Sequence, residues 1–237
     1  MAPRTEPAPW ARSARLHLRR SDPTLARIIS QVPPVNIVRR ANPFEALVRA
    51  IMFQQLAGAA ALAILNRFIA IYADSKFPTP AQVLATPDEV LRKAGVSRQK
   101  MVYLKDLAAH FENGALNFRR IARMDDEKVI EELTRVKGIG RWTAEMFLMF
   151  NLGRPDVFPT DDLGLQNAMM KHFRMRKRPK RSRLIKLGER WRPYRTAATW
   201  YMWRSLRITL PNAVANEPRK RTPRGNDRNA RPRRTSA

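Results

Sequence analysis

The sequence predicts an all-α protein, and three observations support this. Apolar residues recur at three-to-four spacing, for example at Phe44, Leu47, Val48 and Ile51. Polar residues followed by proline mark several helix starts, and no convincing alternating strand competes with this pattern. Hydrophobic residues make up 44% of the 237 residues, which is enough to form a real core.

Four polar–proline pairs are typical of an N-cap followed by proline in the first helical position, namely Asp22-Pro23, Asn42-Pro43, Thr79-Pro80 and Thr86-Pro87. Thr79 with Gln82, and Thr86 with Glu89, also fit the capping-box pattern. Each pair therefore predicts a helix that begins at its proline.

The predicted helices, in chain order, are residues 22–31, 43–56, 58–72, 80–85, 87–94, 97–112, 126–136, 140–152, 162–173, 181–191 and 194–208. The capped prolines open the first, second, fourth and fifth of them. The third carries Leu62, Leu65, Ile69 and Tyr72 at helical spacing. A glycine-containing turn separates the seventh from the eighth.

The charge balance predicts a polyanionic partner. Lys and Arg number 46 against 20 Asp and Glu, which gives a net charge of +26 at pH 7. The longest apolar run, residues 57–65, is too short to span a bilayer. The basic N-terminus lacks the apolar core of a secretory signal, although an organellar transit peptide stays open. We expect an intracellular protein associated with nucleic acid.

The chain divides into three regions. Residues 1–20 read as a basic N-terminal extension, and residues 21–210 as one helical domain without a clear internal linker. Residues 211–237 hold eight basic and two acidic side chains and almost nothing apolar, so we predict a disordered basic tail. Residues 171–183 hold eight Lys or Arg, which favours a loop that follows phosphates.

The composition argues against metal sites built from side chains and against thiol chemistry. The chain has no cysteine, which excludes disulfides, thiolate zinc sites, thiol nucleophiles and cysteine-ligated iron–sulfur clusters. His17, His110 and His172 are scattered and no pair has ligand spacing. We therefore predict no metal site built from side chains.

The turn around Gly138 and Gly140 is a candidate phosphate site. Glycine adopts positive φ and allows another backbone to approach closely. Unpaired N–H groups at the following helix start point outward and, with the helix dipole, suit a phosphate. Lys137 and Arg141 flank the turn and Ile139 lies within it. A plain helix corner is the alternative interpretation, because a lone GxG has little specificity.

Two adjacent acids, Asp161 and Asp162, follow this turn at a distance of about twenty residues. The run Pro159-Thr160-Asp161 suits an N-cap for the helix predicted from residue 162. We therefore assign the capping role to Asp161, which leaves Asp162 for another purpose.

Three runs carry a resemblance to a known family: PFEALVRAIMFQQLAGAAA (43–61), GIGRWTAEMFLMFNLGRPDVFPTDDLGLQ (138–166) and LGERWRPYRTAATWYMWRSL (187–206). Together they closely resemble the helix-hairpin-helix (HhH-GPD) DNA glycosylase superfamily, and within it the 3-methyladenine DNA glycosylase II branch. The resemblance spans about residues 21–210. It implies a two-lobed helical fold in which the middle helices form one lobe, the chain ends form the other, and DNA is gripped over the cleft between them.

The resemblance also implies roles for individual residues. Asp162 matches the catalytic acid, and the base pocket is implied to include Trp142, Met146 and Trp203. The hairpin residues that bind the DNA backbone are implied to be Lys137, Gly138, Ile139, Gly140, Arg141 and Thr143. Hairpin carbonyls near Gly138 and Gly140 are implied to hold K⁺ or Na⁺ in some relatives, and no other cofactor is expected.

The same resemblance points to Gln55 or Leu56 as the wedge that fills the gap left by a flipped base. Relatives that also cut the backbone carry a lysine where this chain has Trp142, so we expect a monofunctional enzyme. The expected substrate is duplex DNA with alkylated purines such as 3-methyladenine or 7-methylguanine, bound by a monomer. The alternatives are a non-catalytic hairpin DNA-binding protein, a bifunctional glycosylase/lyase using another lysine and, more weakly, an architectural protein.

Overall fold

The computed structural model describes residues 8–37, 42–72 and 76–207 of the chain. Helices form all the regular secondary structure in these ranges, which confirms the predicted all-α class. The chain begins with α1 Ala11–Ser21, α2 Pro23–Gln31, α3 Pro43–Phe53, α4 Gly58–Ala70, α5 Pro80–Ala85, α6 Asp88–Lys93, α7 Arg98–Glu112 and α8 Phe118–Ile121. It continues with α9 Asp126–Thr134, α10 Arg141–Phe147, the π-helix η1 Leu148–Leu152, α11 Leu163–His172, α12 Arg181–Gly188, the 3₁₀ helix η2 Glu189–Trp191 and α13 Arg195–Ser205.

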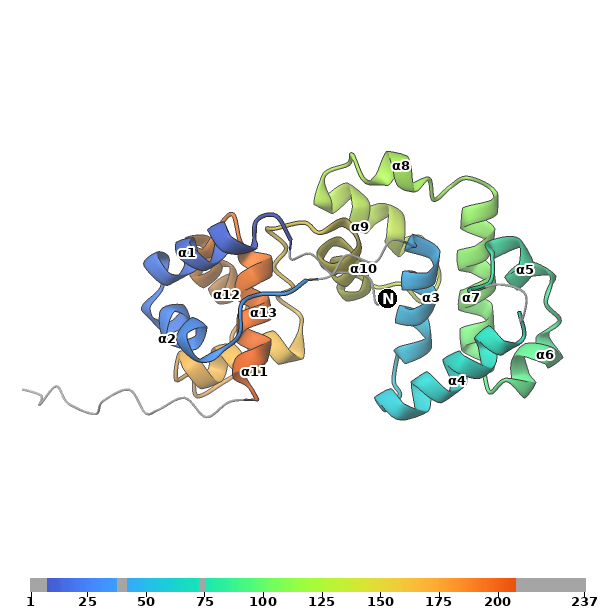
Figure 1. The fold of residues 1–237 in the computed structure, drawn as a ribbon, viewed down its shortest axis with the longest axis horizontal. Coiled ribbons are helices and arrows are strands. Elements are labelled where there is room, and N and C mark those ends of the chain that lie inside the picture. Colours follow the sequence, from blue (N-terminus) through green and yellow to red (C-terminus); the bar gives the residue numbers. More distant parts are fainter. Residues whose placement is uncertain (1–7, 38–41, 73–75, 208–237) are drawn as a thin grey trace, which may run out of the picture.

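The helices form two lobes (Figure 1). The terminal lobe contains α1, α2, α11, α12 and α13, and the middle lobe contains α3 to α10, since Ala144 and Phe147 of α10 belong to its core. Segments from both ends of the chain therefore build one lobe, while its middle builds the other. This arrangement confirms the predicted two-lobed fold.

Side-chain caps set the starts of α2, α3, α5, α7, α8 and α11. The Asp22 side chain accepts hydrogen bonds from the N–H groups of Thr24 and Leu25, and Thr79 and Gln82 form the predicted capping box. The box predicted at Thr86 is wrong, because α6 begins at Asp88 with Pro87 as its N-cap. The Thr86 hydroxyl instead donates to a carbonyl at the end of α5 and contacts the Tyr72 hydroxyl.

The first helix, α1, was not predicted. Its Ala14 and Leu18 are fully buried in the core of the terminal lobe. The assignment of residues 1–20 to an extension therefore needs correction, because residues 11–20 pack as part of the folded domain. Only these two positions of α1 are buried, and the four arginines of the helix favour the interpretation as a solvated basic extension. Residues 1–7 and the predicted tail 211–237 lie outside the described residues.

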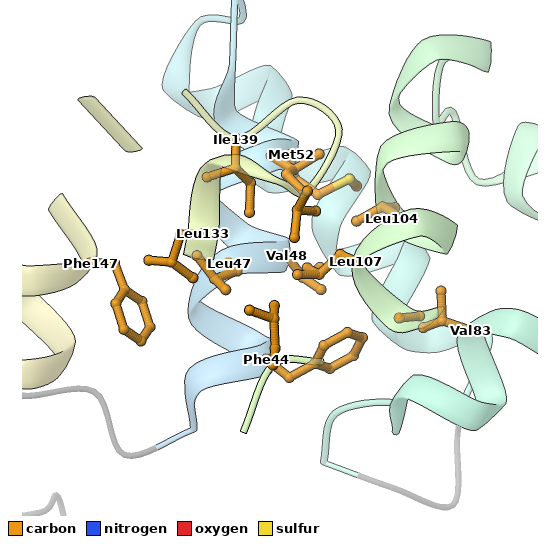
Figure 2. Packing of buried hydrophobic residues seen from close by; sticks show 14 of the residues in the cluster. Phe44, Leu47, Val48, Met52, Val83, Leu104, Leu107, Leu133, Ile139 and Phe147 are labelled. Carbon is orange, nitrogen blue, oxygen red and sulfur yellow. The ribbon is translucent and has the colours of Figure 1, made fainter. Parts of the chain in front are cut away.

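The middle lobe is built around α3. This helix buries residues on nearly every side, including Phe44, Leu47 and Val48, and packs against α4 and α7. Figure 2 shows these side chains meeting Leu104 and Leu107 of α7 in the centre of the lobe. Burial of such side chains contributes roughly 1.5–3 kcal/mol each, so this core holds the surrounding turns in place.

The terminal lobe has its own core, centred on Trp191 and Tyr201, both fully buried. The Trp191 indole donates to the buried Asp22 carboxylate at 2.9 Å, and the Tyr201 hydroxyl accepts the Val35 N–H at 3.3 Å. These long-range hydrogen bonds satisfy buried polar groups that would otherwise be costly.

The two lobes meet at η1 and the segment that follows it. Phe150 packs against the cores of both lobes, and Trp203 reaches from α13 to the core of the middle lobe. Arg195 at the start of α13 binds the Asp156 carboxylate, with Nε to Oδ1 at 2.8 Å. These contacts set the relative position of the lobes. Within the described ranges, every helix is too short or too polar to cross a membrane.

Candidate active site

Asp162 lies where the two lobes meet, at the start of α11. Its Oδ1 accepts the backbone N–H of Leu165 at 2.6 Å and the indole N–H of Trp203 at 2.7 Å. Its Oδ2 accepts the indole N–H of Trp142 at 2.8 Å. Only 8% of the residue is exposed. Donors from three helices therefore fix both oxygens, an arrangement that suits an ionised, acceptor-only carboxylate.

The capping role assigned to Asp161 is wrong. Asp162 is the N-cap of α11, and Asp161 is exposed. The helix begins one residue later than the Pro159-Thr160-Asp161 pattern suggested. One oxygen of Asp162 thus caps α11 and binds Trp203, while the other binds Trp142 alone.

The two tryptophans that hold Asp162 come from different lobes. Trp142 is in the first turn of α10 and is 47% exposed, whereas Trp203 is on α13 and stacks on Phe150 with an interplanar angle of 19°. A Cβ at Gly164 would lie 3.0 Å from Trp203 Cδ1 and 3.1 Å from Asp162 Oδ1. The absence of a side chain at residue 164 therefore makes room for the indole beside the carboxylate.

A cavity of about 580 Å³ opens beside Trp142. Trp142, Met146 and Phe150 contribute aromatic or apolar surface from α10 and η1. The rest of its lining comes from Thr143, Phe147, Asn151, Asn36 and, on α3, Ala46, Leu47, Arg49, Ala50 and Phe53. A mostly apolar cavity with a few polar groups is typical of a small-molecule or base site.

The predicted pocket residues are divided between two hollows. Trp142 and Met146 line the 580 Å³ cavity, but Trp203 lines a neighbouring hollow of about 360 Å³ with Phe150, Trp200, Arg204 and Arg207. Phe150 is shared by both hollows. The structure therefore brings Trp142 and Trp203 to Asp162, whereas Met146 lines the cavity beside Trp142.

The glycine turn between α9 and α10 lies against α7. Gly138 has φ +82°, and a Cβ there would come within 2.2 Å of the Tyr103 ring, so only glycine fits. The Lys137 side chain is 67% exposed, while its backbone N–H donates to the Asp106 carboxylate at 2.8 Å. A Cβ at Gly140 would meet no neighbour within 4 Å.

Three of the predicted DNA-binding side chains have other positions. Ile139 is buried and points into the core of the middle lobe (Figure 2), so it anchors the turn from inside. Thr143 is also buried and lines the 580 Å³ cavity. The Arg141 guanidinium is bound by both carboxylate oxygens of Glu127 and by Glu145, which occupy three of its five donors.

The hairpin carbonyls named from the sequence already accept hydrogen bonds. Gly138 O accepts the side-chain amide of Gln54 at 2.8 Å, and Gly140 O accepts the Ala144 N–H at 3.1 Å. Each carbonyl oxygen has a second lone pair, so these hydrogen bonds do not decide whether K⁺ or Na⁺ binds, and the predicted cation stays a prediction. In the described part of the chain no group of three or more His, Asp or Glu residues is placed to hold a metal.

The wedge candidates follow α3 in an exposed loop. Gln55 has φ +56°, an uncommon conformation for a residue other than glycine, and Leu56 is 40% exposed. Both line a hollow of about 290 Å³ together with Tyr103 of α7 and Gly138 of the glycine turn. The structure thus places both candidates beside the glycine turn.

A second buried carboxyl group, Glu145, lies on α10 one turn after Trp142. Burial raises the pKa of Glu145 to about 7, against the lowering effect of the Arg141 guanidinium. The hydrogen bond from Arg141 lowers the pKa of Glu127. This cluster links α9 to α10 and braces the hairpin behind Asp162.

Comparison with known proteins identifies the family. Residues 48–193 match the family described as HhH-GPD superfamily base excision DNA repair protein. The chain belongs to this superfamily. The matched range includes the loop of residues 54–57 with the wedge candidates, the glycine turn and Asp162, and it ends before Trp203.

Two relatives and one solved structure show how close the likeness is. DNA-3-methyladenine glycosylase 1 of Schizosaccharomyces pombe is 38% identical over 199 residues, which cover 82% of this chain and 87% of that protein. The alkylbase DNA glycosidase-like protein mag2 of the same yeast is 34% identical over 194 residues, covering 80% and 91%. The structure of S. pombe 3-methyladenine DNA glycosylase in complex with abasic DNA has a TM-score of 0.76 at 37% identity, covering 84% of this chain and 98% of that one.

Sequence reasoning missed some residues of this HhH-GPD site. Phe150 continues the four-residue spacing of Trp142 and Met146 along one helix, and this pattern would have revealed it. Arg49 and Phe53 of α3 also line the cavity, but their spacing could not indicate which face of α3 turns toward α10. Their position depends on how the helices of the middle lobe pack.

Proposed function

We propose that this protein is a monofunctional DNA glycosylase that hydrolyses the N-glycosidic bond of alkylated purines, such as 3-methyladenine or 7-methylguanine, in base excision repair. Its family membership and the 38% identical relative named as a 3-methyladenine glycosylase support the reaction class. The observation that carries the proposal is the Asp162 carboxylate, held by Trp142 and Trp203 beside an aromatic cavity.

The chemistry needs one well-placed carboxylate. Positive charge develops on the deoxyribose as the base departs, as in glycoside hydrolysis. The Asp162 carboxylate stabilises that charge and orients a water molecule for attack on the sugar carbon. The C–N bond breaks and the departing base takes the bonding electrons, while the water oxygen bonds to the sugar and releases one proton to the Asp162 carboxylate. An N-alkylated purine is already cationic, so it leaves without needing much protonation.

The base must leave the double helix to reach this carboxylate, and glycosylases are among the enzymes known to flip their target base. The indole of Trp142 and the Phe150–Trp203 stack offer flat, electron-rich surfaces. A cationic base gains stacking and cation–π attraction on such surfaces. Gln55 or Leu56 fills the vacated space in the duplex.

The partner is duplex DNA, bound by a monomer inside the cell. The exposed Lys137 side chain and the N–H groups around Gly138 and Gly140 contact one backbone phosphate, a contact that positions the protein without reading sequence. Because Trp142 occupies the position where lyase relatives carry a lysine, hydrolysis leaves an intact strand with an abasic site.

The decisive experiment uses purified protein and duplexes that contain 7-methylguanine or 3-methyladenine. We expect strand cleavage only after alkali treatment, and none with Asp162→Asn, which should still bind duplex DNA. Cleavage without alkali, or covalent trapping with borohydride, would favour a lyase instead. Binding without excision by the wild-type protein would indicate a non-catalytic hairpin protein.

A further inference from the structure

The loop that carries the wedge candidates, residues 54–57, is held at its start by a lysine of another helix. Lys100 Nζ on α7 donates to Met52 O at 2.6 Å and to Gln54 O at 3.0 Å. These carbonyls belong to the end of α3, where helical partners are missing and the helix dipole favours a cation. Lys100 therefore fixes the point at which α3 ends and the wedge loop begins.

The wedge loop is strained at the next residue. Gln55 has φ +56°, a backbone conformation that costs of order 1–3 kcal/mol for a residue other than glycine. Such a conformation persists only where the surroundings impose it. The carbonyl immediately before Gln55 is one of the two that Lys100 binds, so this ammonium helps to hold the strained residue.

The same face of α7 also contacts the glycine turn, residues 135–140, which we call the hairpin turn. Tyr103 lies one turn after Lys100 and its ring packs directly beneath Gly138. Asp106 lies one turn further and accepts the Lys137 N–H at 2.8 Å. Residues three apart share a helix face, so Lys100, Tyr103 and Asp106 form one continuous support under both segments.

A direct link joins the two segments. The Gln54 side chain donates from Nε2 to Gly138 O at 2.8 Å, across 84 residues of sequence. The wedge loop and the hairpin turn are therefore connected to each other as well as to α7. A shift of the turn toward a phosphate would move Gln54, and with it the neighbouring Gln55.

We propose that Lys100 and Gln54 are positioning residues that tie the wedge loop to the hairpin turn, so that gripping a phosphate at the turn drives the wedge into the base stack. This inference rests on the proposed function, because it assigns the coupling to base extrusion. Neither residue touches the reacting atoms; both act through Gln55, Leu56 and Gly138.

The test compares Lys100→Met, which keeps the apolar stem but removes the donors, with Lys100→Arg, which restores a cation. Gln54→Met removes the amide in the same way. Lys105→Met is the matched control, because Lys105 lies on the same helix but binds Asp88 at the surface. Each full-length variant is bound to a duplex with a tetrahydrofuran abasic analogue next to 2-aminopurine, and to the same duplex without the analogue.

We expect Lys100→Met and Gln54→Met to bind the undamaged duplex within about threefold of wild type, since phosphate contacts persist. Their preference for the abasic duplex should fall about tenfold, and the 2-aminopurine fluorescence increase should be lost. Lys100→Arg should recover most of the preference, and Lys105→Met should behave as wild type. An equal loss of affinity for both duplexes, or an unchanged preference in Lys100→Met, would overturn the proposal.

Hydrogen exchange without DNA provides a second measurement that does not depend on activity. Lys100→Met should speed amide exchange in residues 52–57 at least about tenfold while leaving exchange in α13 unchanged. Unchanged exchange in that loop would also overturn the proposal. If the wild-type protein excises no alkylated base, the proposed function fails, whereas the exchange and abasic-duplex results still decide whether the loop and turn are coupled.

Discussion

Asp162 and Glu145 are both buried carboxyl groups near α10, yet their surroundings differ. Asp162 accepts three hydrogen bonds from neutral N–H groups at the meeting point of the lobes. Glu145 lies behind the hairpin in contact with the Arg141 guanidinium, and burial raises its pKa to about 7. One carboxylate is held by dipoles, while the other is paired with a cation.

This difference distinguishes a carboxylate that is suited to catalysis from a carboxyl group that stabilises the hairpin. Neutral donors fix a carboxylate without cancelling its charge, so Asp162 can face the positive charge of a departing sugar. A carboxyl group that is paired with Arg141 and has a pKa of about 7 carries only part of its charge at neutral pH, so it cannot offer the same field. Glu145 therefore supports the hairpin, and Asp162 is suited to catalysis. Five substitutions test this contrast, in order of decreasing effect on excision.

The largest effect is expected for Asp162→Asn. Loss of the charge should lower the single-turnover excision rate about 1,000-fold, the size typical of removing a major electrostatic contribution. Asparagine is also a good N-cap, so α11 should keep its start, although the amide N–H₂ can no longer accept the Trp142 indole N–H and the melting temperature should fall modestly. Asp161→Asn is the matched control and should retain the wild-type rate. Similar losses in both variants would remove the special role of Asp162.

The next largest effect is expected for Trp142→Phe and Trp203→Phe. Each keeps an aromatic ring but removes one N–H donor to Asp162, and excision should slow about tenfold in either variant. Trp10→Phe is the control, because its indole donates to Gly153 O away from the carboxylate. Single-turnover kinetics on a 7-methylguanine duplex would measure the change. Wild-type rates in both site variants would show that the indoles do not orient Asp162.

A smaller effect is expected for Gly164→Ala. The added methyl group would lie 3.0 Å from Trp203 Cδ1, so the indole must move by a few tenths of an ångström. We expect excision to slow about threefold as the Trp203 hydrogen bond lengthens. Gly58→Ala adds a methyl group to open space and should have no effect. Equal rates in the two variants would indicate that Trp203 has room to adjust.

Glu145→Gln should leave excision nearly unchanged but alter how stability depends on pH. Folded Glu145 has a pKa of about 7 against a usual value of 4.5, so the folded state binds the extra proton between these values. The free energy of unfolding should therefore fall as pH rises from about 4.5 to 7, by up to about 3 kcal/mol.

Urea unfolding of wild type and Glu145→Gln at several pH values would measure this fall, which the variant should lack. Glu127→Gln provides the contrast, because Arg141 lowers the pKa of Glu127 and its contribution to stability grows as pH rises through the acid range. Identical pH profiles for wild type and Glu145→Gln would contradict the assignment.

Local signals in the sequence predicted most helices because capping acts within a few residues. The predicted helix 80–85 matches α5, and Asp22, Asn42 and Thr79 cap as expected. The same reasoning predicted Asp161 rather than Asp162 as the N-cap of α11, because either carboxylate could accept hydrogen bonds at the start of that helix. Indoles 20 and 41 residues away in sequence bind Asp162, and no local pattern could reveal them.

Arg141 shows a similar limit. An arginine beside a glycine turn in a basic chain is expected to bind phosphate. The residues next to Arg141 in the sequence do not indicate another partner. Glu127 lies on α9, 14 residues before Arg141, and its carboxylate accepts hydrogen bonds from the Arg141 guanidinium in the folded hairpin. Ile139 likewise reads as part of a DNA-binding turn, but hydrophobic burial turns its side chain into the core.

By itself the sequence determined most helices, the basic charge and the glycine turn, because these depend on composition, capping and backbone freedom over short distances. Its resemblance to a known family pointed to Asp162. Only the tertiary structure decided which carboxylate is held by both lobes, which side chains line the cavity, and how α7 supports the wedge loop and the hairpin turn together. Those outcomes depend on packing between helices far apart in the chain, where burial and hydrogen-bond geometry select one partner among many that the sequence would allow.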